Sequence, residues 1–219
     1  MKKHPYHDFE PPRGRPSQRA RFARKPRGQA AILDDKQVAR VEKYIDNHSN
    51  VPDADRLKFR LSVYAGLRVG EIAQIQMVDL LQKDGSISPY VRVRAKIAKG
   101  NRERCVPMHP KIHRAVELFL LHHPEVPYVA ISQRFTRSKR QSLTALTNYF
   151  SDLYRKAGLK GFSSHSGRRT FITNLARSMN GTGFTLRDVQ SLAGHSRLDT
   201  TEKYIGLSGD LDKFIARLR

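Results

Sequence analysis

The sequence places side chains that can handle protons and phosphate groups at predicted helix ends and turns. Arg68 and Glu71 are three residues apart, so they share a helix face and can form an ion pair. His165 and Arg168 have the same spacing near a predicted helix start, where backbone N–H groups and the helix dipole favour a phosphate. Each pair alone also has an ordinary explanation, because many such pairs are only structural ion pairs.

Three more side chains belong with these pairs. Lys99 lies in a predicted turn behind a strand, where a lysine is usually just solvated. His195 follows a glycine at a predicted helix end, where capping is the plain explanation. Tyr204 lies in a short helix behind an Asp-x-x-Glu capping pattern, where a tyrosine ordinarily belongs to the core. The order of all these residues along the chain is therefore more informative than any one of them.

Hydrophobic periodicity predicts a mainly helical (α+β) fold that positions these residues. Tyr90–Ile97 partly alternates and is rich in Val and Ile, and Arg104–Val106 returns after a turn, so these segments predict a small antiparallel sheet. Elsewhere apolar side chains recur at helical spacing, with helices predicted to begin at Asp34 or Asp35, Asp53, about Glu71, Pro110, Ser142, about Arg168, Thr185, Asp199 and Asp210.

The charge balance points to a polyanionic partner. The 219 residues include 41 Lys and Arg against 20 Asp and Glu, a formal net charge of +21, and nucleic acid is the default partner of such a chain. No apolar run approaches the roughly 18 residues of a membrane span. The single cysteine, Cys105, excludes disulfide scaffolds and zinc ribbons and favours a reducing, cytoplasmic compartment.

The motifs in their order closely resemble the tyrosine recombinase (phage integrase) family. Six positions match the family's catalytic residues in type, order and approximate spacing, from about Ile32 to Tyr204. The matching segments are Ala65-Gly66-Leu67-Arg68-Val69-Gly70-Glu71, the hairpin Ala98-Lys99-Gly100-Asn101-Arg102-Glu103-Arg104-Cys105-Val106-Pro107-Met108, His165-x-x-Arg168, and Gly194-His195 with Tyr204 nine residues further on. The resemblance implies a helical catalytic domain over residues 34–219 and a site-specific recombinase or integrase.

The resemblance also implies how the reaction proceeds. Tyr204 looks like the nucleophile that attacks a DNA phosphodiester and forms a 3′-phosphotyrosine. Arg68 and Arg168 look like the groups that hold the non-bridging phosphate oxygens, where charge rises toward the transition state. Lys99 looks like the acid that protonates the departing 5′-oxygen. His165 looks like the base that takes the tyrosine proton, and His195 looks like a further hydrogen-bond donor to the phosphate. Glu71 looks like the acid that orients the cluster.

The resemblance implies no metal and no nucleotide cofactor. The nine His and single Cys show none of the usual metal-ligand spacings, and no phosphate-binding Gly-x-x-x-x-Gly-Lys loop is present. A covalent intermediate conserves the bond energy, so religation needs no external energy source. The family works on double-stranded DNA as a homo-tetramer on two sites, in some cases with an accessory DNA-bending protein.

Residues 134–148 carry candidate DNA contacts. The helix predicted from Ser142 buries Leu143, Leu146, Phe150 and Leu153, and a basic loop precedes it. In the family the corresponding helix enters the major groove, where Arg reads guanine and Asn or Gln reads adenine. A solvated helix face remains the alternative. The residues expected to face DNA are Arg140, Gln141, Thr144 and Asn148, with Arg137 and Lys139 in the loop.

Residues 1–33 are predicted to form a basic, Pro- and Arg-rich arm. This segment holds nine basic residues against Asp8 and Glu10, five of the eleven prolines and few large apolar side chains, so disorder is expected. Family members commonly carry a helical DNA-binding domain in front of the catalytic one, so the chain resembles short members that hold the catalytic domain alone. The cations expected to lie on phosphates are Arg13, Arg15, Arg19, Arg21, Arg24, Lys25 and Arg27.

Two alternatives to a recombinase remain open at this stage. A type IB topoisomerase shares much of the same set of residues, although the short chain and the Leu-Ala-Gly-His to Tyr spacing favour a recombinase. A non-catalytic DNA-binding accessory factor descended from a recombinase is the other, and the intact set of six argues against it.

The arm yields the first testable prediction. Each arm cation on a phosphate releases roughly 0.9 counterion from duplex DNA, so deletion of residues 1–30 is expected to weaken DNA binding and to make the slope of log affinity against log salt concentration shallower by about several units. Binding titrations at several salt concentrations measure both. An unchanged affinity and slope would show that the arm does not touch DNA.

Overall fold

The computed structural model describes residues 29–132, 140–179 and 183–202. The helices are α1 (Asp35–His48), α2 (Pro52–Tyr64), α3 (Val69–Ile72), α4 (Pro110–His122), α5 (Leu143–Lys156), α6 (Ser166–Ser178), α7 (Leu186–Ala193) and α8 (Leu198–Glu202). The 3₁₀ turns η1 (Met77–Asp79) and η2 (Ala95–Ile97) and the strands β1 (Tyr90–Val93) and β2 (Arg104–Pro107) complete the described elements. The predicted class, mainly helical with a small antiparallel sheet, is confirmed. None of the described helices is long and apolar enough to cross a membrane.

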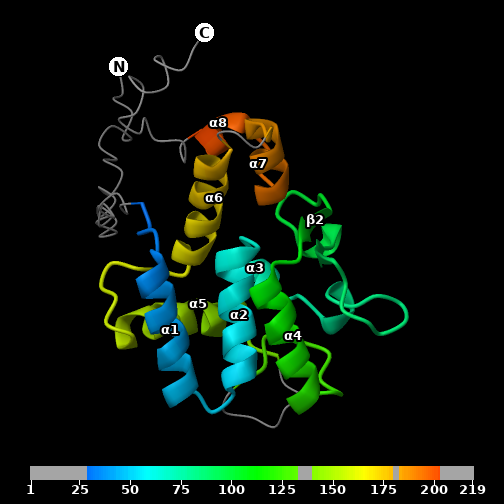
Figure 1. Cartoon of the computed structure of the whole chain (residues 1–219), viewed down its shortest axis with the longest axis vertical. Coiled ribbons are helices and arrows are strands. Elements are labelled where there is room, and N and C mark those ends of the chain that lie inside the picture. The colour runs from blue at the N-terminus through cyan, green and yellow to red at the C-terminus, as the bar shows by residue number, and fades with distance from the viewer. Residues whose placement is uncertain (1–28, 133–139, 180–182, 203–219) are drawn as a thin grey trace, which may run out of the picture.

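Helix α2 lies at the centre of the molecule, with α1 and α4 on either side (Figure 1). Leu57, Phe59 and Leu61 of α2 are fully buried. Helix α2 also packs against α6. Helix α1 presents Val38, Val41 and Ile45 to this core, the face that the periodicity predicts. Burial of these side chains fixes the scaffold from which α3, α6 and the sheet project their polar side chains.

The sheet is a hairpin, with Tyr90 opposite Pro107 and Val93 opposite Arg104. The predicted first strand is shorter than Tyr90–Ile97, because Arg94 turns to the buried carboxylate of Asp79, with Arg94 Nε 2.7 Å from Asp79 Oδ1. The 3₁₀ turn η2 replaces the rest of the strand and leads to the exposed tip around Lys99. Alternation of buried and exposed residues continues through both strands, so one face of the hairpin lies on the core.

The predicted helix starts agree with the structure to within a few residues. Ser142 and Thr185 are the side-chain N-caps of α5 and α7, whereas α6 begins at Ser166, slightly before the expected start near Arg168. The prediction that Leu143 is buried is wrong: its side chain is 55% exposed, because the first turn of α5 stands at the rim of a pocket. The helix predicted from Asp210 lies outside the described residues.

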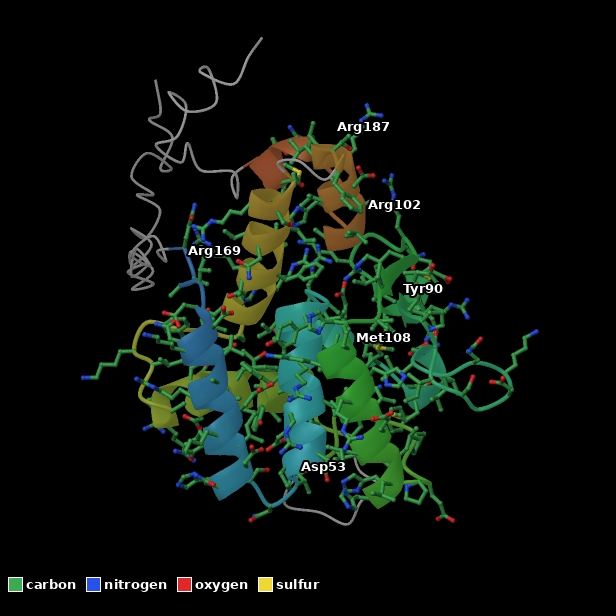
Figure 2. The ribbon with its side chains drawn as sticks, viewed as in Figure 1. Asp53, Tyr90, Arg102, Met108, Arg169 and Arg187 are labelled. Atoms are coloured by element: carbon green, nitrogen blue, oxygen red, sulfur yellow. The ribbon has the colours of Figure 1, made fainter. Side chains whose placement is uncertain are left out.

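Residues 29–33 lie against α6. Leu33 is buried, and its backbone N–H donates to Thr170 Oγ1. Arg169 donates to the carbonyl oxygen of Ala30 and to the side chain of Gln29 (Figure 2). A deletion of the arm that ends at residue 28 therefore keeps every one of these contacts.

Gly66 yields a prediction about stability. It ends α2 with φ +62°, and a Cβ atom there would lie 2.2 Å from Phe171 Cδ1 on α6. We expect Gly66→Ala to lower the free energy of unfolding by about 2–5 kcal/mol, since left-handed backbone costs about 1–2 kcal/mol and overpacking about 1–3 kcal/mol. Denaturant unfolding measures the change. Gly85→Ala is the matched control, because Gly85 also has positive φ but no atom within 4 Å of the added Cβ. Equal losses in the two variants would contradict the packing argument.

Candidate active site

Glu71 is the buried centre of the polar cluster. Its Oε2 accepts from the backbone N–H of Arg68 at 2.8 Å, and its Oε1 accepts from Arg68 Nη1 at 2.9 Å. Arg104 of β2 donates through Nη1 to Oε1 at 2.9 Å and through Nη2 to Oε2 at 2.7 Å. Burial alone would raise the pKa of Glu71, but hydrogen bonds and charges from Arg104 and Arg68 outweigh it and hold the pKa below its usual value. Glu71 is therefore an ionised carboxylate that orients two arginines.

Three arginines from three elements meet the end of α7. Arg104 Nε donates to the carbonyl of Leu192, Arg168 Nη2 to that of Ala193, and Arg68 Nη2 to that of Gly194, at 3.2, 2.6 and 3.0 Å. The last carbonyls of a helix lack intrahelical partners and carry the negative end of its dipole, so guanidinium groups stabilise them. The structure thus brings α3, α6, α7 and β2 together at one place.

Arg68 and Arg168 line one open pocket of about 510 Å³. Arg168 is only 6% exposed and also donates to the carbonyl of Gly66 through Nη1. His165 and Lys99 line the same pocket and are both exposed, so they reach it from α6 and from the hairpin tip. Five of the residues singled out from the sequence, Glu71 among them, therefore surround one space, and the positive charges of Arg68, Arg168 and Lys99 suit a phosphate.

His195 lies on the other side of Lys99, in a second depression between the hairpin tip and α7. Exposed Arg102 and Arg187 contribute to the walls of this depression (Figure 2). The Nδ1 atom of His195 is 2.9 Å from Oγ1 of Thr201, which is fully buried in α8. Burial, then Arg168, Arg68 and Arg104, lower the pKa of His195 to about 4. Its imidazole is therefore neutral at physiological pH.

The predicted DNA contacts on α5 and just before it divide into two groups. Arg140, Thr144 and Asn148 are exposed, as predicted. Gln141 is half-buried, and its Oε1 accepts from Nζ of the fully buried Lys58 at 3.0 Å. Lys58 also forms an ion pair with Asp55 at 2.6 Å, and burial lowers the pKa of this lysine. The amide oxygen of Gln141 therefore accepts a hydrogen bond from inside the protein and is not directed at DNA.

Several predicted site residues lie outside the described part of the chain. These are Tyr204, the loop residues Arg137 and Lys139, and the arm residues 13–27. Helix α8 ends at Glu202, two residues before Tyr204. Within the described ranges, no group of three or more His, Cys, Asp or Glu side chains could hold a metal ion.

Arg104 is the functional candidate that the sequence analysis did not single out. It is 9% exposed, and it lies on the buried face of β2 together with Val106. One signal could have found it. An arginine in phase with a buried valine in a short strand must have an acidic or carbonyl partner in the interior, because an unpaired buried charge is very costly.

The electrostatics of His195 yield a prediction about protonation. In the free protein we expect the His195 imidazole to titrate near pH 4 by NMR, and Arg68→Gln to raise this pKa because one repelling charge is lost. Since the folded-state pKa lies below the unfolded value of about 6.5, His195 makes stability fall as the pH drops from about 6.5 toward 4. Arg92→Gln is the control, because Arg92 is not among the charges that shift His195. A midpoint near 6.5 in the wild-type protein would contradict this account.

Comparison with known proteins gives consistent results. Residues 31–209 match the phage integrase family. The tyrosine recombinase XerC of Chlamydia caviae is 32% identical over 73% of this chain and 49% of its own, and XerC of Staphylococcus haemolyticus is 31% identical over 70% and 49%. The chain thus spans about half the length of these curated relatives.

Solved structures share the fold. The XerA recombinase has a TM-score of 0.66 at 23% identity, over 89% of this chain and 66% of that one. The XerH site-specific recombinase bound to its difH substrate has a TM-score of 0.62 at 20% identity, over 85% and 53%. The Tn1549 transposon integrase in complex with a circular intermediate DNA has a TM-score of 0.67 at 17% identity, over 89% and 67%. With its family match over residues 31–209 and its polar cluster on the shared fold, this chain belongs to the phage integrase family.

Proposed function

We propose that the chain is a site-specific DNA recombinase or integrase that cuts and rejoins DNA through a covalent 3′-phosphotyrosyl intermediate. The observation that carries the proposal is the single pocket shared by Arg68, Arg168, His165 and Lys99, with His195 just beyond Lys99. Family membership and the named activities of the XerC and XerH relatives support it. The active domain spans residues 34–219, with residues 29–33 packed against its helix α6, and the residues before them act as the basic arm.

The proposed reaction begins with the scissile phosphate in the pocket. Arg68 and Arg168 hold its non-bridging oxygens, so charge that develops on phosphorus meets preorganised donors. Tyr204 Oη attacks phosphorus and its proton passes to His165, because only roughly one tyrosine in a thousand is ionised at neutral pH. The bond from phosphorus to the 5′-oxygen breaks as Lys99 gives that oxygen a proton. Attack by the 5′-hydroxyl of another strand reverses these steps and restores Tyr204.

His195 acts in this scheme as a neutral hydrogen-bond donor. Its lowered pKa of about 4 excludes a role that needs the imidazolium in the free protein at neutral pH. If the hydroxyl of Thr201 donates to Nδ1, the ring proton lies on Nε2 and can be donated to a phosphate oxygen. In that arrangement the Thr201 hydroxyl holds the His195 ring in the tautomer that carries its proton on Nε2.

The partner that fits these charges is double-stranded DNA. The XerH and Tn1549 proteins were solved with DNA, and the net charge of +21 and the basic depression with Arg102 and Arg187 suit the same ligand. The exposed candidates for base contacts are Thr144 and Asn148 on α5 and Arg140 just before this helix. Strand exchange calls for a homo-tetramer on two sites in the cytoplasm, with an accessory DNA-bending protein as a further partner.

The nucleophile yields a prediction about chemistry. On nicked suicide duplexes that cover the DNA on either side of the gene, including any inverted repeat found there, we expect the wild-type protein to form a denaturation-resistant DNA adduct. Tyr204→Phe keeps the ring but removes the attacking oxygen, so adduct formation is abolished while DNA binding is retained. Gel electrophoresis under denaturing conditions detects the adduct.

The matched control is Tyr90→Phe, which changes an exposed tyrosine on β1 outside the pocket. Adduct formation by Tyr204→Phe at the wild-type level would remove Tyr204 from the mechanism. Absence of any adduct with the wild-type protein would favour a DNA-binding accessory factor. Relaxation of plasmids that lack the repeat would instead favour a topoisomerase.

A further inference from the structure

Arg104 lies at the junction of the three elements that carry the proposed catalytic groups. It projects from β2, five residues after Lys99, and its nitrogens bond to Glu71 next to Arg68 and to the last turn of α7 before His195. Its guanidinium also fills the space beside Gly194, where an added Cβ atom would lie 3.1 Å from Arg104 Cδ and Nη1. No other described residue has hydrogen bonds to both Glu71 and the Leu192 carbonyl.

The hydrogen bonds of Arg104 make it a support rather than a phosphate ligand. Each of its three nitrogens has a protein acceptor, two on Glu71 and one on Leu192. In the described part of the chain, Arg104 lines the second depression with Lys99 and His195 but not the pocket that Arg68 and Arg168 share, whereas Glu71 lines that pocket. Its influence on a phosphate in that pocket must therefore pass through Glu71 and α7.

Glu71 would hold Arg68 poorly without this support. The two carboxylate oxygens receive four hydrogen bonds, two from Arg68 and two from Arg104. A buried carboxylate that loses half of its donors either rotates toward the remaining one or takes up a proton, and both responses move the Arg68 fork. If the Arg68 guanidinium is misplaced by a fraction of an ångström, it stabilises the transition state much less.

We propose that Arg104 is a positioning residue that fixes Arg68 through Glu71 and fixes the His195 end of α7 through Leu192 and Gly194. The inference rests on the proposed function and deepens it. Arg104 and Lys99 lie on the same hairpin. When this hairpin packs against α3, Lys99 therefore reaches the pocket and Arg68 is fixed at the same time. A bidentate guanidinium is required, since the ammonium of a lysine cannot span both carboxylate oxygens and the Leu192 carbonyl.

The test measures the single-turnover rate of adduct formation on the suicide duplex at saturating protein, which separates chemistry from binding. Arg104→Lys is expected to lower this rate by about 10- to 100-fold, less than the 10²- to 10³-fold typical of losing a donor that touches the reacting group. Its DNA affinity is expected to stay at the wild-type value. Arg92→Gln is the matched control, since Arg92 forms a similar two-pronged pair with Glu103 on the exposed side of the hairpin and should cleave normally. A wild-type rate in Arg104→Lys would overturn the proposal.

A second comparison shows whether Arg104 acts through Glu71. In a Glu71→Gln background, adding Arg104→Gln is expected to lower the rate by a clearly smaller factor than Arg104→Lys does in the wild-type protein, because the route through Glu71 is already lost and only the route through Leu192 remains. This double variant buries no unpaired carboxylate, so it keeps the test available if Arg104→Gln alone fails to fold. Independent, multiplying losses would overturn the proposal.

A substrate with sulfur in place of the 5′-oxygen separates Arg104 from Lys99. The thiolate leaves without protonation, so this substrate should restore the rate of Lys99→Ala but leave Arg104→Lys slow. Full rescue of Arg104→Lys would mean that Arg104 serves only the hairpin lysine, and would overturn the proposal. Absence of adduct with the wild-type protein on every substrate would instead refute the proposed function itself.

Discussion

A buried carboxylate and its four hydrogen bonds determine how the candidate site is assembled. Glu71 cannot lie ionised in the interior unless donors surround it, and the donors come from its own helix α3 and from β2. Removal of one partner from a buried ion pair costs roughly 3–5 kcal/mol, so this arrangement is strongly preferred to one in which Glu71 is buried without its arginine partners. The hydrogen bonds that Glu71 needs therefore hold the hairpin against α3, and they place Lys99 at the pocket.

The carbonyl end of α7 acts as the counterpart of Glu71. Arg104, Arg168 and Arg68 donate to three consecutive carbonyls there, so each guanidinium has at least one acceptor that keeps it in place before any substrate is bound. Burial, together with this concentration of positive charge, lowers the pKa of His195 and keeps its imidazole neutral. A phosphate that enters the pocket meets groups that are already oriented, which is the condition for electrostatic catalysis.

Much of the architecture could be predicted because it depends on local chemistry. The helix starts at Ser142 and Thr185 follow from side-chain caps, and the buried face of α1 follows from the spacing of Val38, Val41 and Ile45. The first strand was predicted too long because its end depends on an ion pair between Arg94 and Asp79, fifteen residues apart. Leu143 was assigned to the core because periodicity marks an apolar face and not what packs against it.

The sequence by itself determined the types and order of the reacting groups, since the order and spacing of the motifs along the chain single out Arg68, Lys99, His165, Arg168 and His195. Only the tertiary structure decided which of them share a pocket, that Gln141 is bonded to the buried Lys58, and that Arg104 supports Glu71 from a strand 33 residues away. The physical reason is that burial, hydrogen-bond partners and pKa depend on groups distant along the chain. The motifs therefore identify the reacting side chains, whereas the packing of α3, α7 and the hairpin determines their hydrogen-bond partners and pKa values.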